Sequence, residues 1–302
     1  YLTLSHRWPP EPILKLAKST LSRLMENIAM EEIPLTFQHA VIVTRQLGYR
    51  YLWIDSLCII QDSAYDWENE SANMGDIYRG SVCTIAVLTN KDSPGSGCFV
   101  TRNPLKFLPY PFSNEKLGVI WARDPCQEML NDNELHSRGW VLQERTLSPR
   151  TLIYGEEVMM WECVTCVTNE LSPNFLTTPK YENTSNLWFN LKLVFKSLAR
   201  MSSLRVACPD LFSFQASYNG LIEEYSKCRL TCSQDKLVAI HGIISKLEET
   251  TGMENVAGLW KDALPEGLLW YRAVDRSGHL SPAYSGPYRA PSWSWAAVDG
   301  PV

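Results

Sequence analysis

The chain has 302 residues, of which 45% are hydrophobic and 20% charged, and its formal net charge is −5 at pH 7. This composition excludes a disordered chain and allows one large domain or two smaller ones with a buried core. The acidic balance and the lack of a Lys/Arg block argue against a nucleic-acid partner. No apolar run is long enough to cross a bilayer, so we expect no membrane partner.

Apolar runs alternate with helical patterns in the first half of the chain, which is typical of an α/β sheet with crossover helices. The run at 51–55 is apolar until its last residue, which favours a central parallel strand. The expected elements, in chain order, are a strand at 1–5, helices at 20–28 and 34–47, a strand at 51–55, a helix at 67–78, a strand at 82–88, a loop at 90–104 and a strand at 117–121.

A short helix that carries Trp140 and Glu144 is predicted next, followed by strands at 151–154 and 158–163 that Gly155 would turn into a hairpin. Past about residue 171 the pattern becomes mainly helical. Helices are expected at 186–200, 212–228, 234–250 and 262–272.

The last segment, 290–298, alternates like a strand and carries Trp293 and Trp295. Two large aromatic side chains are costly to leave in water, so we expect this strand to pack back on the core. The patterns together predict an α/β core in residues 1–170 and a helical extension in residues 171–302.

The nine cysteines are an odd number at irregular spacings, which is not typical of a secreted disulfide framework. We therefore expect a reducing, cytoplasmic location.

Zinc could be held by two cysteine pairs, Cys163 with Cys166 and Cys228 with Cys232. The second pair is spaced one residue wider and lies far along the chain, so we expect no metal site. No signal peptide is visible, and because Tyr1 already lies in a predicted strand, we expect a segment upstream of it.

Residues 137–144 read Ser-Arg-Gly-Trp-Val-Leu-Gln-Glu, with Glu144 four residues after Trp140. On a helix these two positions share a face, so an aromatic plane and a carboxylate would face the same space. That pairing suits a planar, cationic ligand. The pattern also fits an ordinary amphipathic helix, in which Glu144 pairs with Arg138, Arg145 or Arg150.

Polar residues also follow two of the predicted strands, where ligands of open α/β sheets gather. Ser5, His6 and Arg7 follow the first strand, and Asp55 ends the second. Asp55 is either a ligand-facing carboxylate or the cap of the following turn. His6 stands beside an aromatic residue and fits a packing role.

Five blocks occur in a characteristic order: YLTLSHRW at 1–8, YLWIDSLCIIQD at 51–62, DW at 66–67, MGDIY at 74–78 and RGWVLQER at 138–145. In this order they resemble the fungal heterokaryon-incompatibility (HET) domain family. Segments 229–231, 235–237, 258–260 and 291–295 resemble sequences that commonly follow in such proteins. One departure is that Trp8 precedes Pro9-Pro10, where the family usually has glycine. Pro9 has no amide hydrogen to donate to a ligand phosphate.

HET domains are in turn similar to TIR domains, which have a flavodoxin-like parallel sheet and some of which hydrolyse NAD through a glutamate. The TIR pattern is Ser-x-Trp-Cys-x-x-Glu. Trp140 and Glu144 keep its interval, whereas Val141 replaces the cysteine and Ser137 lies one residue further away. The resemblance implies that Glu144 is the catalytic residue. It also implies a ligand site that comprises Ser5, Arg7, Trp8, Asp55 and Trp140.

The resemblance implies an NAD hydrolase that yields nicotinamide and ADP-ribose, with NAD as substrate and no cofactor, linked to heterokaryon incompatibility and programmed cell death. Large aromatics such as Trp67 and Trp121 are assigned to the core. Two other functions stay open. One is a module without catalysis that signals by self-association into homo-oligomers, and the other is a HET scaffold adapted to a metabolite-processing reaction on another small molecule.

Overall fold

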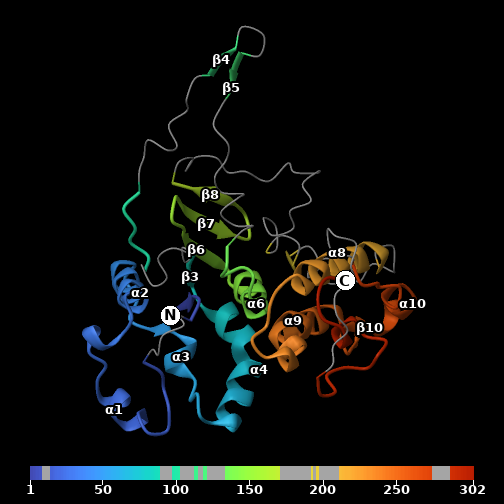
Figure 1. Cartoon of the computed structure of the whole chain (residues 1–302), viewed down its shortest axis with the longest axis horizontal. Coiled ribbons are helices and arrows are strands. Elements are labelled where there is room, and N and C mark those ends of the chain that lie inside the picture. The colour runs from blue at the N-terminus through green and yellow to red at the C-terminus, as the bar shows by residue number, and fades with distance from the viewer. Residues whose placement is uncertain are drawn as a thin grey trace.

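The structure is a computed structural model that describes residues 1–8, 14–88, 97–102, 112–114, 118–120, 133–170, 192, 195–196, 211–273 and 286–302 (Figure 1). Most of the loop expected at 90–104 and of the helix expected at 186–200 lies outside the described residues.

A six-stranded sheet in the order β2-β1-β3-β6-β7-β8 forms the centre of the first half. The first four of these strands are parallel, and β7 and β8 are antiparallel to their neighbours. The predicted α/β class is therefore confirmed. The strands are β1 (Leu2–Ser5), β2 (Leu52–Trp53), β3 (Cys83–Val87), β6 (Arg150–Tyr154), β7 (Met159–Cys163) and β8 (Val167–Asn169).

The predicted hairpin is present and makes the sheet mixed, because the chain turns back directly after β6, where Gly155 N–H donates to the Val158 carbonyl at 3.2 Å. Such a hairpin needs no crossover helix. One detail of the expected sheet was wrong. The run at 51–55 is not a central strand, because β2 is only two residues long, lies at the sheet edge and is half-buried. Ile54 is buried beneath it, and Asp55 already begins a short helix.

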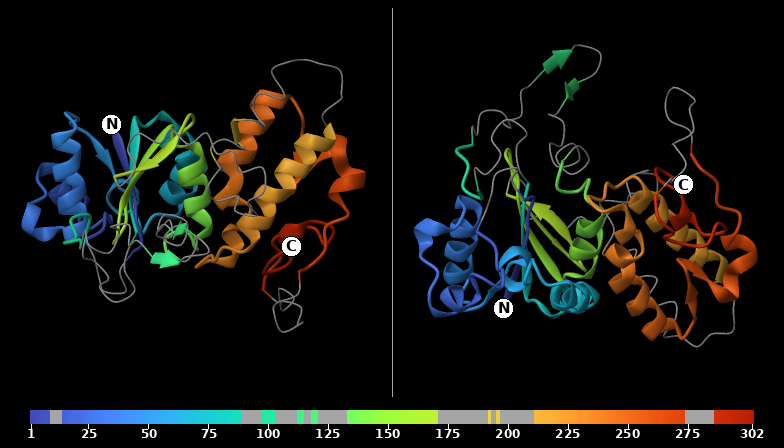
Figure 2. Two further views of the ribbon diagram at one scale, coloured as in Figure 1. Left: turned by 90° about the horizontal axis from the view of Figure 1, so that it is seen from above. Right: turned by 60° about the horizontal axis from the view of Figure 1, so that its bottom comes forward.

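Helices cover both faces of the sheet (Figure 2). On one face Phe37, Ala40 and Val43 of α2 pack against β1. On the other face lie α4 and α6, and Tyr78 Oη of α4 donates to the Leu4 carbonyl of β1 at 3.1 Å. The chain passes from β1 to β2 on one side of it and then to β3 on the other side, so the strand order reverses beside β1. Doubly wound sheets bind ligands at such a point. The helices of this half are α1 (Leu21–Glu26), α2 (Leu35–Gln46), α3 (Asp55–Cys58), α4 (Ala64–Gly80) and α6 (Gly139–Leu147).

The strand expected at 117–121 is present as β5 (Gly118–Ile120), but it lies outside the central sheet. It pairs with β4 (Phe112–Asn114) in a separate two-stranded antiparallel sheet.

The second half is built around α8 (Leu211–Ser226) and α9 (His241–Thr251), with Tyr218, Leu247 and Trp260 in its core. The helix expected at 234–250 begins only at His241, after two 3-10 turns. The helix expected at 262–272 shortens to α10 (Leu264–Gly267). A two-stranded sheet of β9 (Asn255–Val256) and β10 (Leu259–Trp260) lies between α9 and α10 in the sequence.

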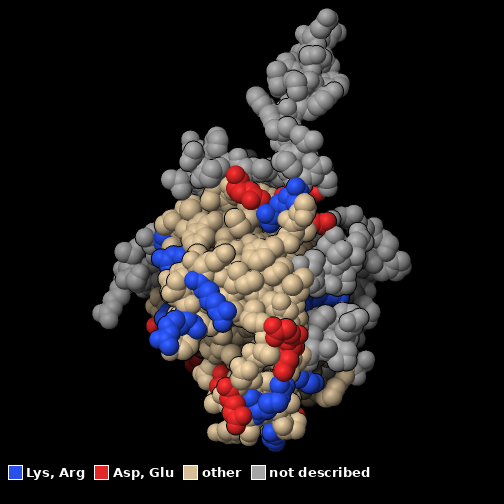
Figure 3. All heavy atoms as spheres, turned by 90° about the vertical axis from the view of Figure 1, so that its left-hand side faces the viewer, with Lys and Arg blue, Asp and Glu red and all other residues tan. Residues whose placement is uncertain are grey.

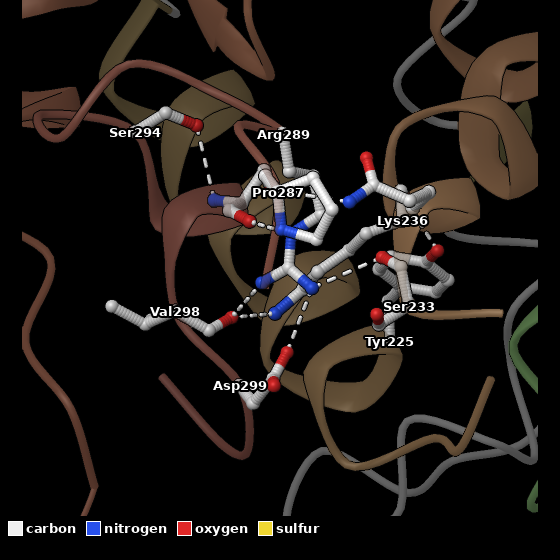
Figure 4. Close-up of polar contacts among 10 residues, drawn as sticks. Tyr225, Ser233, Lys236, Pro287, Arg289, Ser294, Val298 and Asp299 are labelled. Carbon is white, nitrogen blue, oxygen red and sulfur yellow. Dashed lines mark hydrogen bonds and ion pairs between the residues drawn. The ribbon is translucent and has the colours of Figure 1, made fainter. Parts of the chain in front are cut away.

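The C-terminal strand expected at 290–298 was wrong, because this segment forms a 3-10 turn at Trp295–Ala297. Trp295 is buried against Tyr225 in the helical half, whereas Trp293 is 39% exposed. The backbone carbonyls of this segment accept hydrogen bonds from a side chain rather than from a neighbouring strand. Arg289 Nε and Nη2 donate to the carbonyls of Ala296 and Val298 at 2.7 and 3.0 Å, and Arg289 Nη1 binds Asp299 at 2.8 Å (Figure 4).

On the face drawn in Figure 3, basic and acidic side chains are interspersed among uncharged surface. No helix in the described part of the chain is long and apolar enough to cross a membrane.

The two halves meet where α4 crosses α9 with two glycines in contact. A Cβ atom on Gly75 would lie 2.7 Å from Gly242 Cα, and one on Gly242 would lie 2.7 Å from Gly75 Cα. Both atoms belong to helix backbones, so neither can move away cheaply. The close approach therefore requires glycine at both positions.

We predict that Gly75→Ala lowers the free energy of unfolding by about 1 kcal/mol or more, because overpacking outweighs the gain in helix propensity. Urea unfolding of the two proteins measures the difference. Gly267→Ala is the control, since its Cβ would approach nothing closer than 3.6 Å and the change should be neutral or stabilising. An equally stable Gly75→Ala variant would contradict the backbone contact.

Candidate functional site

A cavity of about 430 Å³ lies beyond the carboxyl end of β1, between α3, α4, α6 and the segment that follows α8. Four residues that the sequence singled out, Trp8, Asp55, Trp140 and Glu144, line this one cavity. The other lining residues used below are Trp67, Arg138, Arg229, Leu230 and Asp235.

Glu144 lies on α6 with its side chain buried, at 6% exposure. Ser5 Oγ, at the end of β1, donates to Glu144 Oε2 at 2.5 Å. Burial disfavours the ionised form and raises the pKa of Glu144 to about 7, against the opposing effects of the Arg138 charge and the Ser5 hydrogen bond. The carboxyl group can therefore exchange its proton near neutral pH.

Asp55 satisfies both interpretations that the sequence left open. Its Oδ1 accepts the backbone N–H of Ser56 at 2.7 Å, as a residue that fixes the start of α3 would. Its Oδ2 accepts Trp8 Nε1–H at 2.8 Å, and its side chain lines the cavity. The predicted ligand residues Trp8 and Asp55 thus hold each other in place.

Trp140 is fixed from two sides. Its ring meets that of Trp67 edge to face, with 6.4 Å between centroids. Burial raises the pKa of the Asp235 carboxyl, and a hydrogen bond from Trp140 opposes that rise. Trp67, which the sequence assigned to the core, is half-buried and lines the cavity. An aromatic residue at a helix start carries no sequence signal that separates these two roles.

Arg7 does not line the Glu144 cavity. It lines an adjoining cavity of about 340 Å³ and forms an ion pair with Glu134. The two cavities share Trp8, Arg138 and Arg229. Ser5, also suggested as a ligand residue, lines neither cavity: its side chain is buried and reaches the site only through its hydrogen bond to Glu144.

Arg138 and Arg229 were missed as site residues. Arg138 lay within a recognised block but was considered only as a partner for Glu144. Arg229 comes from the helical half and reaches the site through backbone hydrogen bonds, from Gly139 N–H to the Arg229 carbonyl at 2.9 Å and from Arg229 N–H to the Ser137 carbonyl at 2.6 Å. No local pattern could reveal a pairing across so long a separation.

The structural alternative for Glu144, a network with neighbouring arginines, finds little support. Arg145 pairs with Glu162 at 2.7 Å, and Arg150 donates to the Val82 carbonyl at 3.3 Å. Arg138 does act on Glu144 by lowering its pKa, but its Nη1 donates to the His6 carbonyl at 2.6 Å. His6 itself is buried edge-on against Phe37, which agrees with the packing role.

The four cysteines considered for zinc do not form one cluster. Among the described residues, no group of three or more His, Cys, Asp and Glu side chains could hold a metal ion. Cys228 Sγ instead lies 3.5 Å from the Glu224 carbonyl oxygen.

The doubly wound sheet, with a carboxylate in a cavity beyond β1, defines an α/β domain with a ligand-sized site. Residues 1–144 match the family model described as heterokaryon incompatibility protein (HET), so the chain carries a HET domain over these residues. The match suggests a role in heterokaryon incompatibility. Comparisons with curated proteins and with solved structures find no match.

We predict that Glu144→Gln becomes more stabilising as the pH rises. The folded-state pKa of Glu144 is about 7, above its ordinary value of 4.5, so the free energy of unfolding of the wild type falls as the pH rises from about 4.5 through about 7. Glutamine is neutral and contributes no such fall. The free energy of unfolding of the variant, relative to that of the wild type, should therefore rise by about 2 kcal/mol between about pH 5.5 and about pH 8.5, as measured by urea unfolding.

The control is Glu156→Gln, which changes an exposed carboxylate. Between about pH 5.5 and about pH 8.5 the stability difference of Glu144→Gln from wild type should change more than that of this control. A Glu144→Gln difference that is constant over the same range would show that Glu144 ionises normally.

Proposed function

We propose that this HET domain hydrolyses NAD in the Glu144 cavity, releasing nicotinamide and ADP-ribose, and that loss of NAD links it to heterokaryon incompatibility and cell death. The observation that carries the proposal is the shared cavity of Trp8, Asp55, Trp140 and Glu144. Self-association would activate the site.

The cavity walls suit a planar cation. Trp8 and Trp140 offer aromatic faces, and each ring is held by a carboxylate through its indole N–H. A pyridinium ring stacks favourably on such a face, and the nearby Glu144 carboxylate adds charge attraction. A cavity of about 430 Å³ falls within the size range of small-molecule sites.

Cleavage of the nicotinamide–ribose bond needs one well-placed carboxylate. The bond from C1′ to the ring nitrogen breaks, its electron pair leaves with nicotinamide, and positive charge develops on the ribose. Ionised Glu144 would accept hydrogen bonds from the ribose hydroxyls and stabilise that charge, while Ser5 orients the carboxylate. Water then adds to C1′, and the proton that it gives up passes through a cavity carboxylate to solvent.

The adjoining cavity would bind the pyrophosphate of the same substrate. Arg7, Arg138 and Arg229 line it, and guanidinium groups bind phosphate oxygens through paired N–H donors. Pro9 can donate no backbone hydrogen bond, and it lies outside the described residues. Side chains rather than a backbone loop would therefore bind the phosphates.

We predict that Glu144→Gln reduces nicotinamide release by about 100-fold or more, because glutamine cannot stabilise the developing cation. The measurement is chromatographic detection of nicotinamide from NAD with purified protein at high concentration. The wild-type rate should rise with pH through about 7, where burial sets the pKa of Glu144. Glu156→Gln should keep the wild-type rate and pH profile.

Equal rates for wild type and Glu144→Gln, or no release by either protein under conditions that force assembly, would refute the proposal. Concentration-dependent oligomers and a toxic phenotype that survives Glu144→Gln would then support a self-associating module. A non-nucleotide ligand bound in the cavity would support a metabolite-processing enzyme.

A further inference from the structure

The turn between β7 and β8 brings two cysteines face to face. Glu162 pairs with Val167 in the antiparallel register, so Cys163 and Cys166 form the next cross-strand pair. Cys163 N–H donates to the Cys166 carbonyl at 2.9 Å, and the two sulfur atoms lie 3.6 Å apart. Hydrogen-bonded pairs of this kind have Cα atoms about 5.5 Å apart, which lies within the usual disulfide range. The backbone therefore needs little change to bring the sulfurs to the bond length of about 2.05 Å.

The two thiols differ in acidity. Burial opposes ionisation of Cys163, but hydrogen bonds from the side chain and backbone of Thr165 and from Cys166 outweigh it and lower its pKa to about 7. The Cys163 Sγ–Thr165 Oγ1 distance is 3.1 Å. Burial and the neighbouring Cys163 raise the pKa of Cys166. At neutral pH Cys163 is the better nucleophile, and Cys166 remains a thiol beside it.

Both cysteines are also partly exposed. Cys163 and Cys166 are half-buried at the end of a hairpin, whereas Cys83 and Cys98 are buried. Oxidation of cysteine follows thiolate character and exposure together. Among the described cysteines, Cys163 combines a lowered pKa, partial exposure and a second thiol within reach.

We propose that Cys163 and Cys166 form a thiol–disulfide exchange site that is oxidised reversibly by a low-molecular-weight disulfide such as oxidised glutathione. The Cys163 thiolate attacks one sulfur of the reagent, and the other sulfur leaves as a thiolate. Cys166 then gives up its proton and attacks Cys163 Sγ, which releases the second thiol. In sum, two protein thiols and one external disulfide yield one protein disulfide and two external thiols.

This disulfide should be a reversible modification rather than a structural crosslink. It would close a loop with only two residues, Val164 and Thr165, between the cysteines, and short loops gain the least stability from a crosslink. The turn is already held by its own backbone hydrogen bond and by Lys196 Nζ, which donates to the Val164 carbonyl at 3.2 Å. The proposal does not depend on hydrolysis of NAD.

The test treats the folded, full chain with oxidised glutathione at neutral pH, blocks the remaining thiols and maps every cysteine by mass spectrometry. We expect a Cys163–Cys166 disulfide that an excess of reduced glutathione reverses. We also expect Cys163 to react with iodoacetamide with a midpoint near pH 7, and exposed Cys232 serves as the internal control for the alkylation rate. In Cys166→Ser, a mixed disulfide with glutathione should accumulate at Cys163.

Three results would overturn the proposal. The first is glutathione bound at Cys232 or Cys58 while Cys163 and Cys166 stay reduced. The second is wild-type oxidation that stops at the mixed disulfide, which would deny Cys166 its resolving role. The third is Cys163 alkylation no faster than that of Cys232, which needs no variant and so does not depend on whether Cys166→Ser folds.

Discussion

The buried hydrogen bond between Ser5 and Glu144 is the interaction on which the site depends. It joins residues 139 positions apart and fixes the end of β1 against the middle of α6. A carboxyl group placed there loses most of its hydration, which is why its pKa rises to about 7 and why the fold must hold α6 firmly from other directions. One such hold is the buried pair between Arg145 of α6 and Glu162 of β7, with N–O distances of 2.7 and 3.1 Å. Another is Lys192, whose ammonium group donates to the Ser148 carbonyl at the end of α6 at 2.5 Å.

The helical half completes the cavity rather than merely following the HET domain. The family match ends at Glu144, yet Arg229, Leu230 and Asp235 supply part of the cavity wall. Their position depends on the backbone pairing of Arg138 with Arg229 and on the glycine contact between α4 and α9. The enclosed, poorly hydrated surroundings of Glu144 therefore belong to both halves together. A carboxylate in such surroundings acts more strongly on a developing positive charge than one in water would.

Local periodicity predicted much of the fold and part of the site. The helices α2 and α4 and the strands β1, β3, β6 and β7 follow from apolar spacing, and the interval of four put Trp140 and Glu144 on one face of α6. Edge positions and long-range pairings have no such signal. An apolar run reads alike at the sheet edge and in its centre, so β2 was misplaced, and alternation at 290–298 was mistaken for a strand although Arg289 satisfies its carbonyls. Gly75 and Arg229 gain their roles only from partners far along the chain.

The two carboxylates of the cavity are suited to different tasks by the chemistry of their partners. Asp55 accepts two N–H groups, from Trp8 and Ser56, and an N–H can only donate, so both oxygens must serve as acceptors. Glu144 is instead met by the hydroxyls of Ser5 and Tyr78, and a hydroxyl can donate or accept. The hydrogen bond with Ser5 can therefore persist in either protonation state of Glu144, whereas Tyr78 has a single hydroxyl hydrogen that the Leu4 carbonyl also accepts. Asp55 is built to position Trp8, and Glu144 is the group whose charge can respond when a cation enters the cavity.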